Sequence, residues 1–264
     1  MRIQRLLKYS LLIPSALLFI LPAGCAPEGN IVTQFSTIDA LLAGSYDGFI
    51  ELSEVDRAGN LGIGTFDRLD GEMILLDDVF WQSRSDGKII RMDKNVTTPF
   101  ASVCQFEPET TGDLEAEPSM SALLGRLDGS CTDVNGIYAV RIRGDFGPVR
   151  VRAVPAQRKP YPPLAEVTRD QPEFELTGSS GTVVGFRLPP FVKGLNVPGW
   201  HLHYLSEDHS FGGHILQLEL KEGVYEIDSL NRLMVQLDET GRGMAGLDLT
   251  RDRSEELKQV EGGE

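Results

Sequence analysis

The stretch GWHLHYLSEDHSFGGHILQLEL, residues 199–220, decides the fold around the functional part of this chain. Apolar and aromatic residues flank the polar turn SEDH, which predicts two β-strands folded back as a hairpin. All four histidines of the chain lie here, and His201 and His203 are two residues apart in the first strand. Side chains two apart on a strand leave the same face, and a hairpin would bring His214 back beside them.

Three neutral imidazoles with an open fourth position form the ligand set of a catalytic zinc ion. We therefore predict that His201, His203 and His214 bind one zinc ion (Zn2+), and that His209 is a turn residue. The alternative is a pair of surface histidines on a hairpin. The third histidine and the preceding Gly-Gly favour the metal site over that alternative.

The first 24 residues read as an export signal. Three basic residues precede an apolar stretch, Leu11 to Leu21, which is too short to span a membrane as a helix. The small residues before Cys25 resemble a bacterial lipoprotein box, in which that cysteine is lipidated. Pro22 departs from the usual pattern, so plain cleavage nearby is the alternative.

This signal predicts an exported lipoprotein that faces the periplasm or the cell exterior and meets the membrane through its lipid anchor. Residues 26–33 would then be a tether. Without residues 1–24 the chain keeps 22 of its 25 basic residues and all 39 acidic ones, a net charge of −17. Such a field repels phosphates, which excludes nucleic acid as a partner but leaves a small anionic substrate open.

Cys104 and Cys131 are the other cysteines of the chain. In an oxidising compartment they could form a disulfide. Two free thiols are the alternative, and spacing alone leaves both open.

Composition and periodicity predict a strand-rich α+β fold with two packed sheet-based halves, residues 34–158 and 159–264. We expect mixed β-sheets or a half-open barrel, a few short helices, and a polar tail after the metal ligands. A helix capped by Ser36, one over Pro118–Leu127 and one around Ser254–Lys258 are expected, with a proline-rich connector over Pro155–Pro172. Strands are expected at Gly48–Val55, Gly62–Asp67, Glu72–Leu76, Val79–Ser83, Lys88–Met92, Ile137–Arg143, Val149–Val154, Thr182–Leu188, Trp200–Leu205, His214–Leu220, Val224–Ile227 and Leu233–Leu237, the sixth and seventh forming a hairpin around Asp145-Phe146-Gly147.

Two further residues could carry chemistry. Glu72 follows a turn and heads an apolar strand, where burial would raise its pKa toward the value useful in proton transfer. Arg152 shares a strand face with Arg150 and could hold a substrate carboxylate with its two-pronged donor set. An exposed strand-start glutamate and a solvated arginine face are the alternatives.

Several segments together resemble the α-acetolactate decarboxylase family, and the likeness runs from about Gln34 to the C-terminus. The matching pieces are Ser36–Gly48, Leu61–Glu72, Pro99–Ala101, Tyr138–Gly144, Gln157–Tyr161, Gly185–Phe186 and Asn196–His203. The resemblance implies zinc-dependent decarboxylation of 2-acetolactate to acetoin by a homodimer, with no organic cofactor.

The same resemblance implies roles for particular residues. His201, His203 and His214 would hold zinc, Glu72 and Arg152 would be catalytic, and Thr65 and Arg152 would contact the substrate. A glutamate near the C-terminus would join them, either Glu261, which we favour, or Glu256. Two positions depart from the family pattern: Asp78 stands where a glycine is usual, and Trp200 where a tyrosine is usual.

Two other functions compete. His201-x-His203-x-x-x-Glu207 imitates half of a cupin motif, which would make Glu207 a ligand and the protein a metal-dependent oxygenase or isomerase. The second half of that motif is missing. The other alternative is a lipoprotein that binds a metal or a small acid without turning it over. The absence of a Gly-x-Ser-x-Gly motif argues against nucleophilic catalysis by serine.

Overall fold

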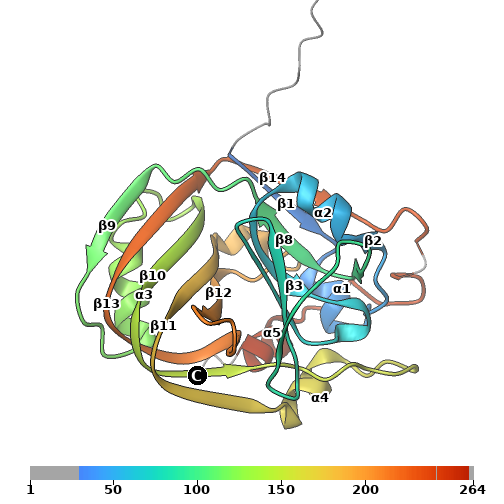
Figure 1. Ribbon diagram of the computed structural model, residues 1–264. Coiled ribbons are helices and arrows are strands. Elements are labelled where there is room, and N and C mark those ends of the chain that lie inside the picture. The colour runs from blue at the N-terminus through green and yellow to red at the C-terminus, as the bar shows by residue number, and fades with distance from the viewer. Residues whose placement is uncertain (1–29, 242, 262–264) are drawn as a thin grey trace, which may run out of the picture.

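The computed structural model describes residues 30–261 except 242, and it is strand-rich with several short helices (Figure 1). A barrel-like sheet packs against a second, larger sheet, and a two-stranded pair of β2 (Ile50–Glu51) and β7 (Thr97–Thr98) lies beside the larger one. This architecture confirms the expected α+β class with two sheets.

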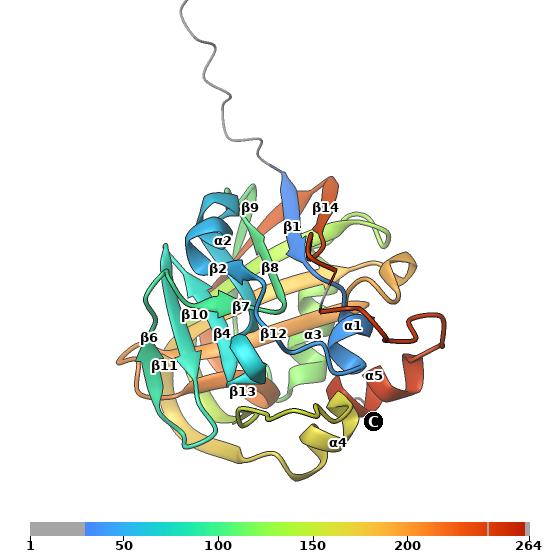
Figure 2. The same cartoon turned by 90° about the vertical axis from the view of Figure 1, so that its right-hand side faces the viewer.

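The larger sheet has seven strands in the order β14-β1-β8-β3-β4-β5-β6. It is mixed, because β1 pairs with β14 in parallel while its other neighbours are antiparallel. Figure 2 shows β1 and β14 side by side at one edge. The strands are β1 (Ile31–Phe35), β3 (Leu61–Thr65), β4 (Glu72–Leu76), β5 (Val79–Ser83), β6 (Ile89–Arg91), β8 (Ala101–Cys104) and β14 (Arg232–Gln236).

The second sheet has five strands in the order β10-β11-β12-β13-β9. It closes on itself because β10 also pairs with β13. The long strands bend around a shared interior, as the left side of Figure 1 shows. The strands are β9 (Thr110–Leu114), β10 (Ile137–Arg152), β11 (Glu173–Leu188), β12 (Gly199–Ser206) and β13 (Gly212–Leu230).

Helices cover the ends of these sheets. They are α1 (Ile38–Leu42), α2 (Leu52–Ala58), α3 (Met120–Asp128), α4 (Leu164–Val167) and α5 (Ser254–Glu261), with short 3-10 turns at Asp67–Leu69, Thr168–Asp170 and Pro190–Val192. Among the described residues no helix is both long and apolar enough to cross a membrane. α5 returns beneath β12 and next to α4, which brings the end of the chain to the barrel (Figure 1).

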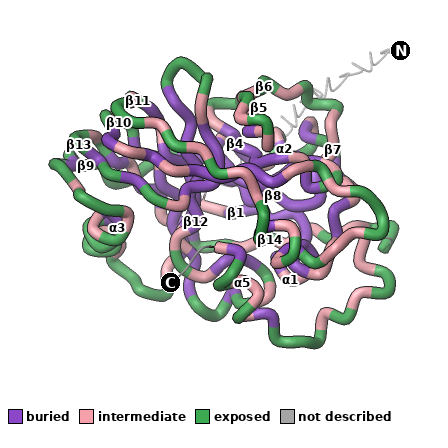
Figure 3. The backbone as a smooth tube through the Cα atoms, turned by 90° about the horizontal axis from the view of Figure 1, so that it is seen from below, coloured by how far each residue is buried: buried purple, intermediate pink, exposed green. Residues whose placement is uncertain are grey.

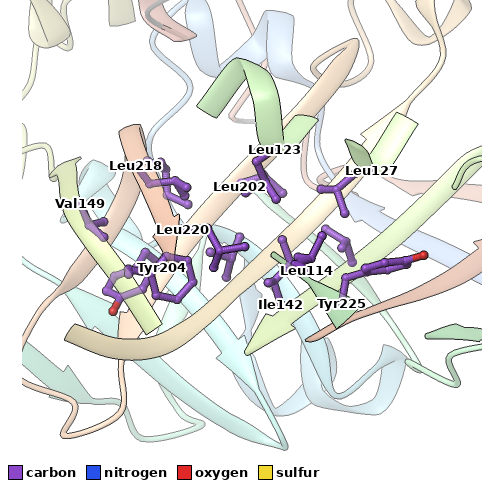
Figure 4. Packing of buried hydrophobic residues seen from close by; sticks show 14 of the residues in the cluster. Leu114, Leu123, Leu127, Ile142, Val149, Leu202, Tyr204, Leu218, Leu220 and Tyr225 are labelled. Atoms are coloured by element: carbon purple, nitrogen blue, oxygen red, sulfur yellow. The ribbon is translucent and has the colours of Figure 1, made fainter. Parts of the chain in front are cut away.

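Two of the hydrophobic clusters lie inside the barrel and between the barrel and the seven-stranded sheet. Inside the barrel, Tyr204, Leu202 and Leu220 pack with Leu123 and Leu127 of α3 (Figure 4). A second cluster joins the outer face of the barrel to the seven-stranded sheet, with Ile74 on one side and Phe186 and Leu205 on the other. Buried residues accordingly concentrate where barrel and sheet meet (Figure 3). This packing places β12 against β4.

Several expected elements differ in the structure. The hairpin expected around Asp145-Phe146-Gly147 is wrong, because β10 runs through as one strand whose register against β13 shifts there. A bulge absorbs the extra residues without a turn. His214–Leu220 and Val224–Ile227 likewise form one strand, β13.

Other differences are local. Only Ile50–Glu51 of the strand expected over Gly48–Val55 is a strand, and α2 follows it because Leu52 and Val55, three apart, bury one helix face. The cap of α1 is Thr37, whose hydroxyl accepts from the Ala40 N–H at 3.1 Å, rather than Ser36. The connector over Pro155–Pro172 contains α4.

The expected halves do not correspond to the sheets. β10 lies in the expected N-terminal half but belongs to the barrel. β14 lies in the expected C-terminal half but forms an edge strand of the larger sheet. Residues 31–33 are part of β1 and not of a tether. The expected signal, residues 1–24, and Cys25 lie outside the described residues. Of the two alternatives for Cys104 and Cys131, the structure has the free thiols, which belong to different hydrophobic clusters.

Candidate active site

The predicted hairpin forms the centre of the site. β12 and β13 are antiparallel, and their register places His203 directly opposite His214. His201 lies two residues before His203, on the same face of β12. The three side chains are buried, from 1% exposed for His203 to 9% for His201.

The three imidazoles converge on one point. One ring nitrogen of each lies within 4.8 Å of the other two. The ring centroids are 5.0 to 5.4 Å apart and the rings are tilted steeply against one another, so they surround a point rather than stack. A group of this kind could hold a metal ion.

One ring nitrogen of His203 supports the metal interpretation. Its Nδ1 lies 2.8 Å from the Met73 carbonyl oxygen, so Nδ1 carries the proton and donates it there. Nε2 is then an acceptor, buried and without a hydrogen-bond partner among the described residues. A carbonyl that fixes the tautomer of a histidine is the usual support of a metal ligand. The orphaned Nε2 therefore fits a metal ion.

Burial keeps the three histidines neutral, as ligands must be. Desolvation lowers the pKa of His201 to about 3, with a further contribution from the charge of Arg152. Desolvation also holds the pKa values of His203 and His214 well below the ordinary value. Neutral imidazoles present lone pairs to a cation without first losing a proton.

Glu72 begins β4 and faces this group. It is 8% exposed, and its Oε2 lies 3.8 Å from His203 Nε2. Desolvation raises the pKa of Glu72 to about 7, against the lowering effect of Arg152, and Glu261 raises it further. The carboxyl group is therefore placed to exchange a proton near neutral pH.

Arg152 and Glu261 come from different elements, β10 and α5, and meet beside His214. Arg152 pairs with His214 across β10 and β13, and its Nη1 donates to the Val260 carbonyl of α5. Its Nη2 lies 4.0 Å from Glu261 Oε1. Glu261 Oε2 is 3.8 Å from His214 Nε2 and 3.9 Å from His201 Nε2.

The competing glutamate, Glu256, lies elsewhere on α5. Its Oε2 is 3.5 Å from Arg253 and its Oε1 is 3.3 Å from Arg251. Burial raises the pKa of Glu261, and the nearby Arg152 opposes that shift. Of the two glutamates, Glu261 is therefore the one that the fold brings to the histidines.

Thr65 completes the wall beside Glu72. The two residues are paired across β3 and β4, and Thr65 Oγ1 donates to the Gly71 carbonyl at 2.7 Å. The polar residues that line a small cavity of about 40 Å³ here are Thr65, Glu72, Arg152, His201, His214 and Glu261. Apolar residues form the rest of its wall, among them Ile38, Leu41, Leu69, Phe100, Val154 and Leu164.

Neither Trp200 nor Glu207 lines the cavity. Trp200 is not among its lining residues, because its side chain leaves the opposite face of β12 and donates through Nε1 to Asp128 Oδ1 at 3.0 Å. Glu207, the ligand that a cupin site would need, is exposed in the turn. His209 lies in that turn, as predicted, with a positive φ of 54°.

The sequence analysis missed two backbone groups of the site. The carbonyls of Met73 and Val260 orient His203 and Arg152. Any residue type supplies a carbonyl, so no pattern of side chains could have indicated them. The apolar wall from α1 was missed for a similar reason, since Ile38 and Leu41 read as ordinary core residues.

Comparison with known proteins agrees with this geometry. The family model "Alpha-acetolactate decarboxylase" matches residues 32–247. A protein of that name from Methanosarcina mazei is 42% identical over 232 residues, which is 88% of this chain and 80% of that protein. One from Methylococcus capsulatus is 41% identical over 234 residues, 89% of this chain and 90% of that protein.

A solved structure supports the same assignment. The crystal structure of alpha-acetolactate decarboxylase from Bacillus subtilis strain 168 superposes with a TM-score of 0.85 at 34% identity. The match covers 88% of this chain and 99% of that one. By sequence and by fold, this chain belongs to the alpha-acetolactate decarboxylase family.

Proposed function

We propose that this protein decarboxylates 2-acetolactate to acetoin with a zinc ion held by His201, His203 and His214. The names of its relatives give the substrate. The main evidence for a metal ion is His203 Nε2, which is buried and has no hydrogen-bond partner among the described residues. It belongs to a group of three neutral imidazoles that could hold one ion. Three imidazoles with room for a further ligand are typical of catalytic zinc.

Decarboxylation leaves negative charge on the substrate, and the site must stabilise that charge. When the bond between the central carbon and the carboxylate breaks, carbon dioxide leaves and the electron pair moves toward the neighbouring ketone oxygen, giving an enediolate. A bound zinc ion would act as a Lewis acid toward the oxygen atoms that gain this charge. The histidines would position that charge-accepting centre at a buried place, where electrostatic stabilisation is stronger than in water.

Arg152 orients the leaving carboxylate. Arg152 is 4% exposed, and its Nε has no hydrogen-bond partner among the residues that the structure describes. A planar donor group of this kind matches a carboxylate with two parallel hydrogen bonds. Because α5 holds Nη1 through Val260, the remaining donors are fixed in direction.

Glu72 delivers the proton that completes acetoin. The enediolate carbon must gain one proton, and Glu72 lies beside the histidines with a pKa raised to about 7 by burial. In the metal-free protein a substantial fraction of this carboxyl group is therefore protonated at neutral pH. Transfer from Glu72 Oε2 leaves a carboxylate that solvent protonates again before the next turnover.

The decisive alternative is a protein that binds a metal or a small acid without turning it over. Incubation of the purified protein with 2-acetolactate separates the two, because decarboxylation releases carbon dioxide and forms acetoin in equal amounts. The proposal expects both products at a rate far above the spontaneous reaction. Stable acetolactate in the presence of zinc-loaded protein would contradict it.

We further propose that the protein is exported, anchored through a lipid on Cys25, and assembled as a homodimer. The basic and apolar residues 1–24 and the small residues before Cys25 support the anchor. A Cys25→Ser variant should lose incorporation of labelled fatty acid and move from the membrane to the soluble fraction. Mass measurement in solution should give twice the chain mass; a monomer would contradict the assembly.

A further inference from the structure

β5 contacts the metal-binding hairpin at two places. Ser83 Oγ donates to the Gly212 carbonyl at 2.6 Å, and Ser83 is 1% exposed. Two residues earlier, the ring of Trp81 stacks on His209 in the turn of the hairpin, with ring centroids 4.1 Å apart and planes 31° from parallel. Residues two apart on a strand share a face, so both contacts come from the same side of β5.

The position of Ser83 joins two parts of the site. Ser83 is paired with Glu72 across β4 and β5. Its acceptor, Gly212, lies two residues before His214 at the start of β13. The buried hydroxyl of Ser83 therefore connects β5, which lies beside the strand of Glu72, to β13, which carries His214.

The chain is tightly packed at this point. Gly213 has a φ of 148°, and a Cβ there would lie 2.5 Å from the Arg152 carbonyl oxygen and 3.2 Å from Ser83 Oγ. β13 consequently passes close to both β10 and β5 immediately before His214. A small shift of β13 at Gly212 would move His214 relative to both Arg152 and Glu72.

We propose that Ser83 is a positioning residue that fixes His214 against Glu72, with the Trp81–His209 stack as the second contact at the hairpin turn. This inference rests on the proposed function, since it concerns the same site. A buried hydrogen bond between a hydroxyl and a carbonyl constrains both groups, because an unpaired carbonyl in that place is costly. Loss of the hydroxyl frees the start of β13 and loosens the convergence of the three imidazoles.

The test measures zinc affinity by competition with a chromophoric chelator, at a temperature where all variants remain folded. Ser83→Ala should weaken zinc binding about tenfold, the lower end of the effect of groups that orient metal ligands. Ser102→Ala is the matched control. Ser102 is also buried in the seven-stranded sheet, but the hydrogen bond that its hydroxyl would lose comes from Asn196 Nδ2, at 2.9 Å, and not from the hairpin. It should lower the melting temperature while its zinc affinity stays within twofold of the wild type.

Two further variants keep the test informative if Ser83→Ala folds poorly. Ser83→Thr retains the hydroxyl and should keep most of the zinc affinity. His209→Ala removes the stack at an exposed residue, so the core is unchanged, and zinc binding should weaken about two- to fivefold, within the range of aromatic pair energies.

The inference is overturned if folded Ser83→Ala and His209→Ala both bind zinc as tightly as the wild type. It is also overturned if Ser102→Ala weakens zinc binding as much as Ser83→Ala does. These results are separate from the proposed function. A wild type that binds zinc more tightly than Ser83→Ala but releases no carbon dioxide from 2-acetolactate would refute the function and leave the positioning role standing.

Discussion

His203 and His214 are direct partners across two antiparallel strands, and their ring centroids are 5.4 Å apart. On the other side of β13, Arg152 of β10 is the partner of His214. One row across three neighbouring strands thus supplies two candidate metal ligands and the candidate carboxylate-binding group. Regular pairing of this kind fixes side-chain positions more firmly than a loop would.

Replacement of Glu72 by Gln should reduce turnover about 100- to 10,000-fold, the range typical of a lost proton-transfer group. Gln keeps the size of the side chain and carries no acidic proton. Zinc content should remain at the wild-type level, which elemental analysis of the purified protein would check. Glu54→Gln, on the exposed side of α2, is the control and should be fully active. Loss of zinc from Glu72→Gln would instead make Glu72 a ligand.

Arg152→Lys keeps the positive charge but removes the planar donor set. We expect kcat/KM for 2-acetolactate to fall about 10- to 100-fold, because a single ammonium cannot make two parallel hydrogen bonds and also hold Val260. Steady-state kinetics would measure this. Arg150→Lys provides the matched control, since Arg150 lies on the same strand, is partly exposed and pairs with Glu173 at 3.5 Å. Equal losses in both variants would argue against a specific role of Arg152.

The raised pKa of Glu72 predicts how the metal-free protein responds to pH. Its folded pKa is about 7 and its ordinary value is 4.5, so the folded state binds this proton more tightly than the unfolded state. The stability contributed by Glu72 is present below pH 4.5 and is lost as the pH rises through 7. Glu72→Gln removes this loss.

Thermal unfolding of both metal-free proteins would check the effect. The melting temperature of Glu72→Gln relative to wild type should increase between pH 5 and pH 8. Comparing the two proteins cancels the opposite contribution of the histidines, whose lowered pKa values favour the folded state as the pH rises. A difference that is independent of pH would show that Glu72 titrates normally.

Asp78→Gly should stabilise the fold. Asp77 and Asp78 connect β4 to β5, and both have positive φ, 49° and 64°. Glycine adopts this conformation without a steric penalty, so the gain in the free energy of unfolding should be up to about 1 kcal/mol, less the larger chain entropy that glycine adds to the unfolded state. Denaturant titration would measure it. Asp77→Gly should gain less, because Asp77 also pairs with Arg141 at 3.0 Å. A destabilised Asp78→Gly variant would refute the argument.

Local sequence patterns predicted the bounds of some strands correctly. They failed for strands whose bounds depend on pairing with residues far away in the sequence. β4 and β5 have the bounds expected from apolar residues on either side of a two-residue turn. β10 did not, because Asp145-Phe146-Gly147 has the composition of a turn, yet pairing with both β11 and β13 keeps the chain extended. Closure of the barrel and the entry of β14 into the other sheet depend on such long-range pairing, which periodicity does not encode.

The site was predictable to the extent that its side chains form unusual patterns. The spacing of His201, His203 and His214 was enough to place them together on a hairpin. Glu72, Arg152 and Glu261 were indicated together only by the family resemblance, because a strand-start glutamate and a strand arginine are common on surfaces. Their burial arises when β4, β10 and α5 meet around the hairpin.

The most direct test is to remove and restore the metal. After dialysis against a strong chelator, the protein should stay folded, contain no zinc and release no carbon dioxide from 2-acetolactate. Titration with Zn2+ should restore activity in proportion to the metal bound and reach a plateau at one ion per chain, and His214→Ala should show neither binding nor recovery. Full activity in the rigorously metal-free protein would contradict the account.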